Sequence, residues 1–466
     1  MQCPHCGADT PIDKDKCVAC GQPMAVAAGA VEDVESADEA KKKAGWGATL
    51  LRYFVGLVVL ACVLGFGASY LDKRPLTKSK VEKPQLHAPA PSYPMPKVPK
   101  ALPSAPVIEP VGVGLPSVPK VEMAFGSRDP RVRRLFLERN GGDAQTEAAV
   151  ERGLAWLKTK QELDGHWSAE KFGGQARNDL GVTGLALLAF LGAGHSHSTD
   201  GPYKDTVAKA LDYVLKRQNT KGLFPGALYA QGICTMAIVE AHGMSVDSTI
   251  LDHARRATEA IIAAQNESGG WDYSPVSPRK RGDTSVTGWQ VMALKSAKRI
   301  GLDVPDTVME NMHRYIASVT KETGDIGYSN FTDPLHGWRT SSALTAAGLN
   351  ALLFSGADRS NPAVQKAISI VLEKLPSEPK LKGDKWKNAA NVYFWYHGSL
   401  ALCRLGGREW NIWNARLKSL ILKLQRKTGT QAGSWNTCGD PYVKQGGDVY
   451  FTSLCILALE VYYRYD

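Results

Sequence analysis

The sequence predicts an all-α protein whose larger part, residues 124–466, is a closed ring of six helix hairpins, an (α/α)6 toroid. Three observations predict it. A seven-residue signature, Gln-x3-Gly-x-Trp, returns along the chain. Helical patterns recur in pairs about every fifty residues, and the second helix of each pair is nearly all apolar. Four smaller segments precede the ring: a cysteine-rich module (1–24), a charged linker (25–45), an apolar segment (46–71) and a proline-rich stretch (72–123).

The first segment carries two Cys-x2-Cys pairs, each followed by glycine: Cys3, Cys6, Cys17 and Cys20. A structural zinc ion binds four thiolates in a tetrahedron, and Cys-x2-Cys on a tight turn presents two thiolates at a suitable spacing. So short a segment cannot build a core without a metal or a covalent staple. The pattern resembles a zinc ribbon holding one structural zinc. A rubredoxin-like iron site and four unrelated cysteines are the alternatives.

The two segments that follow predict a linker and a membrane anchor. Residues 25–45 are mostly small and charged. Residues 53–71 contain no charged side chain, and a helix of that length spans about 28 Å, close to the hydrocarbon thickness of a bilayer. We therefore predict one transmembrane helix within 46–71, with a buried soluble helix as the alternative. Cationic residues flank both ends, so the positive-inside rule gives no orientation. Reduced zinc thiolates favour a cytoplasmic ribbon and a ring on the opposite side.

Residues 75–123 contain twelve prolines, for example in HAPAPSYPMPKVPK. Proline lacks the backbone N–H and clashes with the preceding turn, so such a stretch forms neither helix nor sheet interior. We interpret residues 72–123 as an extended polyproline II spacer. A ligand for an SH3-type domain is the alternative.

The formal net charge of +10 indicates attraction to anionic partners. Many of the cationic residues stand near the apolar segment, where they match anionic lipid headgroups. No RNA-binding or DNA-binding signature accompanies them, so the sequence offers no evidence for nucleic acid as a partner.

Residues 144–466 predict the ring itself. In each pair the first helix is amphipathic and the second is apolar, which fits an outer and an inner layer. An open array of repeats would need a polar cap at its end, and the last helix is as apolar as the others, which favours closure. Aromatic residues mark the six repeats: Trp167, Phe224, Trp271, Tyr328, Trp386 and Trp435.

Two copies of the signature, QELDGHW (161–167) and QNESGGW (265–271), match the QW motif of squalene and oxidosqualene cyclases. Residues 144–466 resemble the α/α toroid of those cyclases and of protein prenyltransferase β subunits. With its predicted ribbon, anchor and stalk, the chain resembles bacterial membrane proteins that carry prenyltransferase and squalene-oxidase repeats. The resemblance implies that the motif is structural, because its Gln and Trp tie one helix end to the next repeat.

The catalytic signatures of these families are absent from the sequence. Cyclases protonate an alkene with an Asp-x-Asp-Asp cluster, and no such cluster occurs here. Prenyltransferases hold a zinc ion with a late Asp-x-Tyr-His-Thr motif. The matching stretch runs from Asp448 to Thr452 and has Phe451 in the place of the metal-binding histidine. Whether the ring is an enzyme therefore stays open.

Candidate ligand-binding residues stand near the starts of the predicted inner helices. Asp179, Asp283 and Asp448 each open such a helix, where a carboxylate also caps free N–H groups. Arg339 opens the fourth, where a cation opposes the helix dipole. It is therefore a candidate anion ligand, with pairing to Asp283 or Asp448 as the alternative.

The remaining candidates are mostly aromatic: Tyr229, Trp289, His397 and Tyr450. They are expected either to line an apolar pocket or to pack in the core. Three functions follow from the sequence. The first is a membrane-anchored toroid that binds a lipid, an isoprenoid or a peptide in its centre. The second is a cyclase- or transferase-like enzyme with a non-standard site. The third is a scaffold whose zinc ribbon and ring contact partners on two sides of a membrane.

Overall fold

The computed structural model describes residues 124–277, 280–330, 339–383 and 385–465. The predicted zinc ligands Cys3, Cys6, Cys17 and Cys20, the predicted transmembrane helix and the proline-rich linker all lie outside these residues. Among the helices that are described, none combines the length and the hydropathy needed to cross a membrane.

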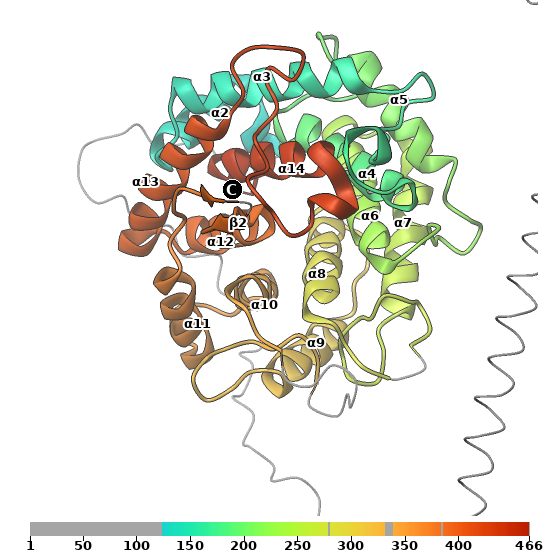
Figure 1. The fold of residues 1–466 in the computed structure, drawn as a ribbon. Helices are drawn as coiled ribbons and strands as arrows, with labels where there is room; N and C mark the ends of the chain where they lie inside the picture. Colours follow the sequence, from blue (N-terminus) through green and yellow to red (C-terminus); the bar gives the residue numbers. More distant parts are fainter. Residues whose placement is uncertain (1–123, 278–279, 331–338, 384, 466) are drawn as a thin grey trace, which may run out of the picture. The chain divides into compact units, whose positions relative to one another are not determined.

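The described chain folds into helix hairpins (Figure 1). The first helices of the hairpins are α3 (Ala144–Lys160), α5 (Lys204–Leu215), α7 (Ser248–Ala263), α9 (Asp306–Ser318), α11 (Pro362–Glu373) and α13 (Gly407–Leu424). The second helices are α4 (Asp179–Gly192), α6 (Leu228–Ser245), α8 (Thr284–Arg299), α10 (Ser342–Phe354), α12 (Val392–Leu405) and α14 (Val443–Leu459). This order confirms the six predicted pairs.

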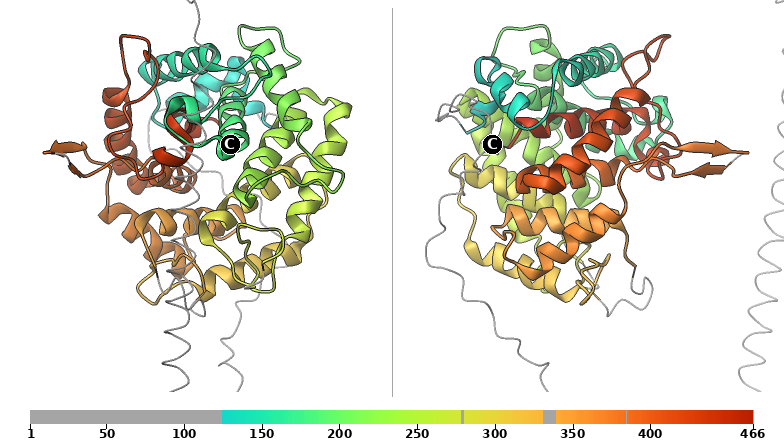
Figure 2. Two further views of the ribbon diagram at one scale, coloured as in Figure 1. Left: turned by 45° about the vertical axis from the view of Figure 1, so that its right-hand side comes forward. Right: turned by 90° about the vertical axis from the view of Figure 1, so that its left-hand side faces the viewer.

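The second helices form a closed inner ring. Each one packs on the next from α4 to α14, and α14 packs back on α4. The first and last hairpins also meet on the outside, where α3 contacts α13. Figure 2 shows the helix hairpins in two further views, turned by 45° and by 90°. The predicted closure is therefore confirmed for residues 144–465.

Hydrophobicity explains which helices lie inside. Every residue of α4 except Asp179 and Gly181 is buried. In α7 the buried residues include Ile250, Ala254 and Ile261, spaced so that they share one face, while the opposite face meets solvent. An all-round apolar helix needs neighbours on every side, so it takes the inner position.

Smaller elements join these hairpins. A short helix, α2 (Pro130–Arg139), precedes the ring, and the antiparallel strands β1 (Lys380–Lys382) and β2 (Lys385–Lys387) form a hairpin between α11 and α12. Short 3-10 turns are η1 (Gly126–Arg128), η2 (Glu170–Phe172), η3 (Ala176–Asn178) and η4 (Glu460–Tyr462).

The QW motif is a joint between consecutive repeats, as the family resemblance implies. The side-chain amide of Gln265 donates to the carbonyl of Gly269 in its own loop and to Val308 in the next outer helix, both at 2.8 Å. The indole of Trp271 is fully buried and donates to Ile261 at 2.7 Å, which anchors the loop to the end of α7. Gln161, Gly165 and Trp167 repeat this arrangement in the first hairpin.

Glycine is required in the motif for two reasons, its backbone conformation and the space around it. Gly269 has φ +89°, a left-handed conformation that strains any other residue. A β-carbon there would lie 2.1 Å from the carbonyl oxygen of Asn311 in α9. The loop therefore touches the next outer helix backbone to backbone, and a side chain would separate them.

The sixth joint closes the ring. Gln425 donates to Ala149 of α3 at 2.8 Å and to Gly433 at 3.0 Å. A β-carbon on Gly433 would lie 2.3 Å from the carbonyl oxygen of Arg152, again in α3. The last repeat thus contacts the first by the same device that links the others, with four extra residues between Gln425 and Gly433.

Two of the predicted aromatic marks were wrong. In the fourth repeat the joint is Thr320, Gly324 and Ile326, since Gly324 has φ +97° and its added β-carbon would clash with Lys366 of α11. Ile326 is fully buried in the tryptophan position, so Tyr328 stands two residues beyond the joint. Trp386 lies on the exposed strand β2, 38% exposed, and marks no joint.

A buried charge cluster at the C-terminal ends of the inner helices joins the segment just before the ring to the segment just after its last helix. Glu240 of α6 accepts from Arg128 at 2.8 Å and from Arg464 at 2.9 Å, and all three side chains are buried. Glu460 lies 3.4 Å from Arg464 and is also fully buried. Burial tends to raise the pKa of Glu240, but the two guanidinium groups lower it below its usual value. For Glu460 the effect of burial is larger than the opposing effect of Arg464 and Arg128, and its pKa is raised to about 8.

Candidate functional site

The N-terminal ends of the inner helices meet around the centre of the ring. The hydroxyl of Tyr393 in α12 donates to the backbone carbonyl of Ser285 in α8 at 3.2 Å. Deeper in the ring, Trp289 of α8 stacks on Tyr396 of α12 with ring centroids 5.7 Å apart. Because α10 stands between α8 and α12 in the circuit, these contacts pass through the centre.

Asp283 is the carboxyl group nearest this meeting point. It is fully buried and caps α8, and its Oδ1 accepts from the backbone of Ser285 at 2.8 Å and of Val286 at 3.2 Å. Its Oδ2 has no hydrogen bond of normal geometry within the described residues. Burial raises the pKa of Asp283, against the lowering effect of the Ser285 and Tyr328 hydroxyls beside it.

Tyrosines from five successive repeats surround this carboxyl group, and we call them the tyrosine cluster: Tyr229, Tyr273, Tyr328, Tyr393 and Tyr442. The Tyr229 hydroxyl donates to the Ser285 hydroxyl, and the Tyr328 hydroxyl donates to that of Tyr273 at 3.2 Å. Tyr273 is 40% exposed and Tyr442 is 44% exposed, so the cluster reaches solvent.

A second carboxyl group, Asp440, lies at the edge of the cluster. It is buried and accepts from the backbone N–H of Val392 at 2.8 Å and of Tyr442 at 2.9 Å, so it caps α12 and orients the loop that carries Tyr442. Burial raises its pKa to about 6, although these backbone donors oppose the shift.

This shift predicts a pH dependence of stability. Between about pH 4 and pH 6 the folded state binds the Asp440 proton that the unfolded chain has lost, so the free energy of unfolding falls as the pH rises. A raise of about two pKa units corresponds to about 3 kcal/mol in total. Urea unfolding of the wild type and of Asp440→Asn at pH 4 and pH 7 measures this contribution. The contributions of the other carboxyl groups cancel when the pH dependence of the variant is subtracted from that of the wild type. Parallel pH profiles would contradict the expectation.

The centre below the cluster is filled by side chains. Trp289, Tyr396 and His397 pack together and are at most 2% exposed. Asn350 donates to Nδ1 of His397 at 2.9 Å, while burial lowers the pKa of this histidine to about 3 and keeps it neutral. Nε2 of His397 is buried and has no partner within the described residues. Trp289 and His397 are therefore core residues at this depth.

Three other predicted site residues have partners outside the tyrosine cluster or no hydrogen-bond partner within the described residues. Asp179 accepts from the backbone of Ala169 at 2.8 Å within its own repeat, and burial raises its pKa. Asp448 is paired with Arg426 at 2.9 Å. The hydroxyl of Tyr450 is buried and has no hydrogen-bond partner in the described chain.

Arg339 does not open its helix as predicted. It is exposed, and α10 begins three residues later at Ser342, capped by the Ser341 hydroxyl. The backbone carbonyl of Arg339 accepts from Tyr328 at 2.7 Å and so helps to position the cluster. The expected conflict between this cation and the helix dipole is absent, because the helix starts after it.

Four residues of this site were not among the predicted site residues: Tyr273, Tyr328, Asp440 and Tyr442. Tyr328 was predicted only as the aromatic mark of the fourth repeat. One signal was present, because Tyr273 and Tyr328 each stand two residues after the buried end of a joint, Trp271 and Ile326. That shared offset places the two tyrosines at equivalent points of neighbouring repeats, and their hydroxyls meet at 3.2 Å. Asp440 and Tyr442 follow no repeat position that the sequence marks.

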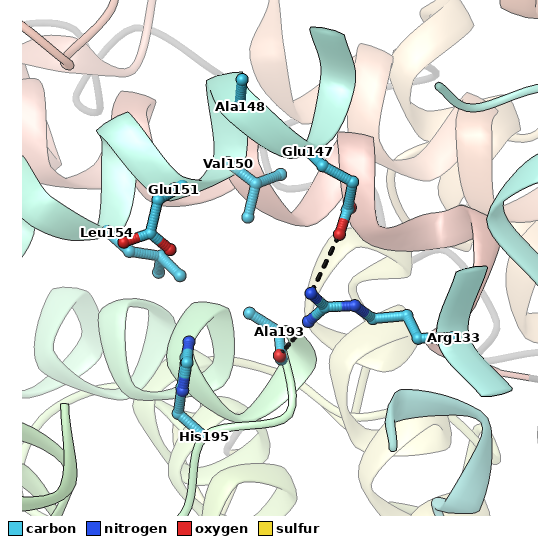
Figure 3. Close-up of a pocket in the computed structure, with 8 residues that line it drawn as sticks. All are labelled: Arg133, Glu147, Ala148, Val150, Glu151, Leu154, Ala193 and His195. Atoms are coloured by element: carbon cyan, nitrogen blue, oxygen red, sulfur yellow. Dashed lines mark hydrogen bonds and ion pairs between the residues drawn. The ribbon is translucent and has the colours of Figure 1, made fainter. Parts of the chain in front are cut away.

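Two pockets lie away from the cluster. One has a volume of about 300 Å³ beside α3 and is shown in Figure 3; its polar residues include Arg133, Glu147, Glu151 and His195. Arg133 pairs with Glu147 at 3.0 Å, and Glu151 accepts from Tyr203 at 2.5 Å, so protein partners hold these groups. A second pocket, about 330 Å³, lies between α3 and the loop after α13. None of the eight predicted ring residues lines either pocket.

No group of three or more histidine, cysteine or acidic side chains in the described part of the chain is arranged to hold a metal ion. The predicted zinc site is a separate matter, because its four cysteines lie outside that part.

No family model and no curated protein matches the sequence. Among solved structures, the chain is similar to the GH76A α-1,6-mannanase from Salegentibacter sp. HEL1_6, with 10% identity, 68% of this chain and 98% of that chain covered, and a TM-score of 0.52. An inactive variant of that mannanase in complex with α-1,6-mannotetrose gives 11% identity, coverage of 68% and 99%, and a TM-score of 0.51. The apo type II terpene cyclase MstE from Scytonema gives 15% identity, coverage of 68% and 97%, and a TM-score of 0.48. At such identities the mannanase likeness shows the α/α toroid fold alone.

Proposed function

We propose that the ring is a binding module that holds its ligand at the tyrosine cluster, at the N-terminal ends of the inner helices. One observation carries the proposal: five tyrosines from five repeats converge on the buried carboxyl group of Asp283, and two of their rings reach solvent. Convergent hydroxyls and a carboxyl group give directional hydrogen bonds, and the exposed rings give an apolar contact surface.

Binding without chemistry fits the residues better than catalysis by the mechanisms of the resembling families. Asp283 and Asp440 are separate carboxyl groups, each held by backbone N–H donors, whereas the resembling cyclases protonate an alkene with an adjoining Asp-x-Asp-Asp cluster. Phe451, in the place of the prenyltransferase histidine, is fully buried in the core. An enzyme with a non-standard site remains the alternative, with Asp283 and the tyrosine hydroxyls as its proton carriers.

Of the three ligand classes that the sequence suggests, we propose a peptide. A lipid or isoprenoid chain binds best in a deep apolar cavity, and here Trp289, Tyr396 and His397 occupy the centre. A peptide instead needs a shallow surface with hydrogen-bonding groups and rigid aromatic side chains. Tyrosine supplies both at low cost in conformational entropy.

Selection from a random peptide library on the purified full chain tests the proposal. We expect enriched peptides whose affinity falls at least about tenfold in Tyr273→Ser and Tyr442→Ser, since a truncated aromatic anchor costs on the order of 2 kcal/mol. Ile412→Ser is the matched control, because Ile412 is 37% exposed on the outer helix α13. Its affinity should equal that of the wild type.

Two outcomes would overturn the peptide assignment. One is that the selected peptides bind Tyr273→Ser and Tyr442→Ser as well as the wild type. The other is that native mass spectrometry finds a co-purified lipid or isoprenoid that both substitutions release, which would assign the cluster to an apolar ligand.

We further propose that Cys3, Cys6, Cys17 and Cys20 hold a structural zinc ion and that residues 46–71 anchor the chain in a membrane. The spacing of the cysteines and the uncharged run support these assignments. The ribbon would lie in the cytoplasm and the ring on the opposite side. In that arrangement the ribbon is free to contact a protein partner, so the scaffold alternative and the binding module are compatible.

A further inference from the structure

We propose that the β1–β2 hairpin is a contact site for an anionic membrane surface, separate from the tyrosine cluster. The hairpin reads KLK in β1 and KWK in β2, and all six residues are exposed. It projects from the ring, as both views of Figure 2 show.

The strand register sorts the two kinds of side chain onto opposite faces. Leu381 pairs with Trp386, whereas Lys380 faces Lys387 and Lys382 faces Lys385. Because directly opposed residues of an antiparallel pair share a face, one face carries four lysines and the other the apolar pair. The hairpin is therefore amphipathic over only three residue pairs.

The lysine face is electrostatically unfavourable without a partner. Like charges directly opposite each other destabilise a strand pair, and here two such pairs adjoin. Within the described residues, no ion pair involves any of the four: Lys380, Lys382, Lys385 and Lys387. Glu378, two residues before Lys380, pairs with Lys423 at 2.8 Å, and the charge of Lys380 adds to the lowering of its pKa. Asp384, in the turn between the strands, lies outside the described residues. An anionic surface would relieve this repulsion.

The apolar face decides which anionic surface fits. Leu381 is 58% exposed and Trp386 is 38% exposed, and part of the Trp386 ring lies over Gly439. Tryptophan and lysine together are typical of the membrane interface, where the indole enters the headgroup layer and the ammonium groups meet lipid phosphates. A soluble polyanion would satisfy the lysines but would leave the leucine in water.

Lysine reactivity in the full chain tests this contact. The chain is incorporated into or mixed with vesicles of phosphatidylcholine, alone or with phosphatidylglycerol, and acetylation by a water-soluble reagent is followed residue by residue. We expect the four hairpin lysines to react at least about fivefold more slowly on the anionic vesicles, and salt to restore their reactivity. Because the readout is local, it does not depend on whether residues 46–71 insert.

Controls make the result decisive. Lys216, whose side chain is 71% exposed directly after the outer helix α5, should react equally with both vesicles. Replacing Leu381 and Trp386 by serine should reduce the protection. Both side chains lie outside the buried core of the ring, so the ring should still fold. Equal reactivity of the four lysines on both vesicle types would overturn the proposal. Protection by soluble nucleic acid but not by anionic vesicles would overturn it too and would assign a polymer as the partner.

Discussion

Replacing Glu240 by glutamine is expected to lower the free energy of unfolding by about 4 kcal/mol, because breaking a buried ion pair leaves charges without a partner. Glu240 is the carboxylate that both Arg128 and Arg464 contact, at 2.8 Å and 2.9 Å, and all three side chains are buried. With glutamine in its place, two guanidinium groups stay in the core and one neutral oxygen must serve both. Urea unfolding of the full chain at neutral pH, followed by the near-ultraviolet circular dichroism of the ring, measures the change.

Glu460→Gln is the matched control, and the opposite result is expected. Glu460 is as buried as Glu240 and belongs to the same cluster, yet its pKa is raised to about 8, so it is largely protonated at neutral pH. Glutamine replaces a neutral acid with a neutral amide of the same shape, and the free energy of unfolding should change by less than about 1 kcal/mol. Equal losses in the two variants would show that both glutamates are ionised and that the cluster is a balanced four-charge network.

Gly269→Ala is expected to destabilise the ring by about 3 kcal/mol or more. About 1 kcal/mol or slightly more comes from placing alanine at φ +89°. The remainder comes from overlap with the carbonyl oxygen of Asn311, which would lie 2.1 Å from the new β-carbon. Relief requires the joint to move away from α9, and the bridge from Gln265 to Val308 would stretch with it.

Gly173→Ala separates these two causes. Gly173 has nearly the same backbone conformation, φ +88°, but a β-carbon there would meet no atom within 4 Å. Gly173→Ala should therefore lower the free energy of unfolding only by the conformational cost, about 1 kcal/mol. The difference between the variants measures the contact between repeats. If the two alanines cost the same, the close approach at the QW joint contributes nothing to stability.

Much of the fold could be predicted because the features that define each repeat lie in short stretches of sequence. The apolar inner helices, the amphipathic outer helices and the Gln and Trp of the joints are all visible in short stretches of sequence. The fourth joint escaped detection because Thr320 and Ile326 replace the polar and aromatic marks, while only Gly324 keeps its role. Gly324 is needed there because its φ is positive and because Lys366 of α11 leaves no room for a β-carbon. Neither condition can be inferred from residue types along the sequence.

The candidate site was predicted less well, for a physical reason. Asp179, Asp283 and Asp448 each stand four residues before a threonine of an inner helix, yet only Asp283 lies within the tyrosine cluster. Asp283 caps α8, Asp179 is the first residue of α4, and Asp448 lies within α14 directly after the non-helical Gly447. Asp448 is drawn to Arg426, which belongs to the loop that carries the four extra residues of the sixth joint. Equivalent positions in a repeat therefore diverge according to the partners that insertions bring near.

By itself the sequence determined the ring, because the period of about fifty residues, the alternation of amphipathic and apolar helices and the Gln-x3-Gly-x-Trp signature are local properties that stacking repeats must satisfy. The tertiary structure alone decided what fills the centre. There Trp289 meets Tyr396 and Tyr393 meets Ser285, across more than a hundred residues of chain. Such contacts depend on how the ring of inner helices closes. The spacing of residues along the sequence does not determine which side chains face one another across the centre of the ring.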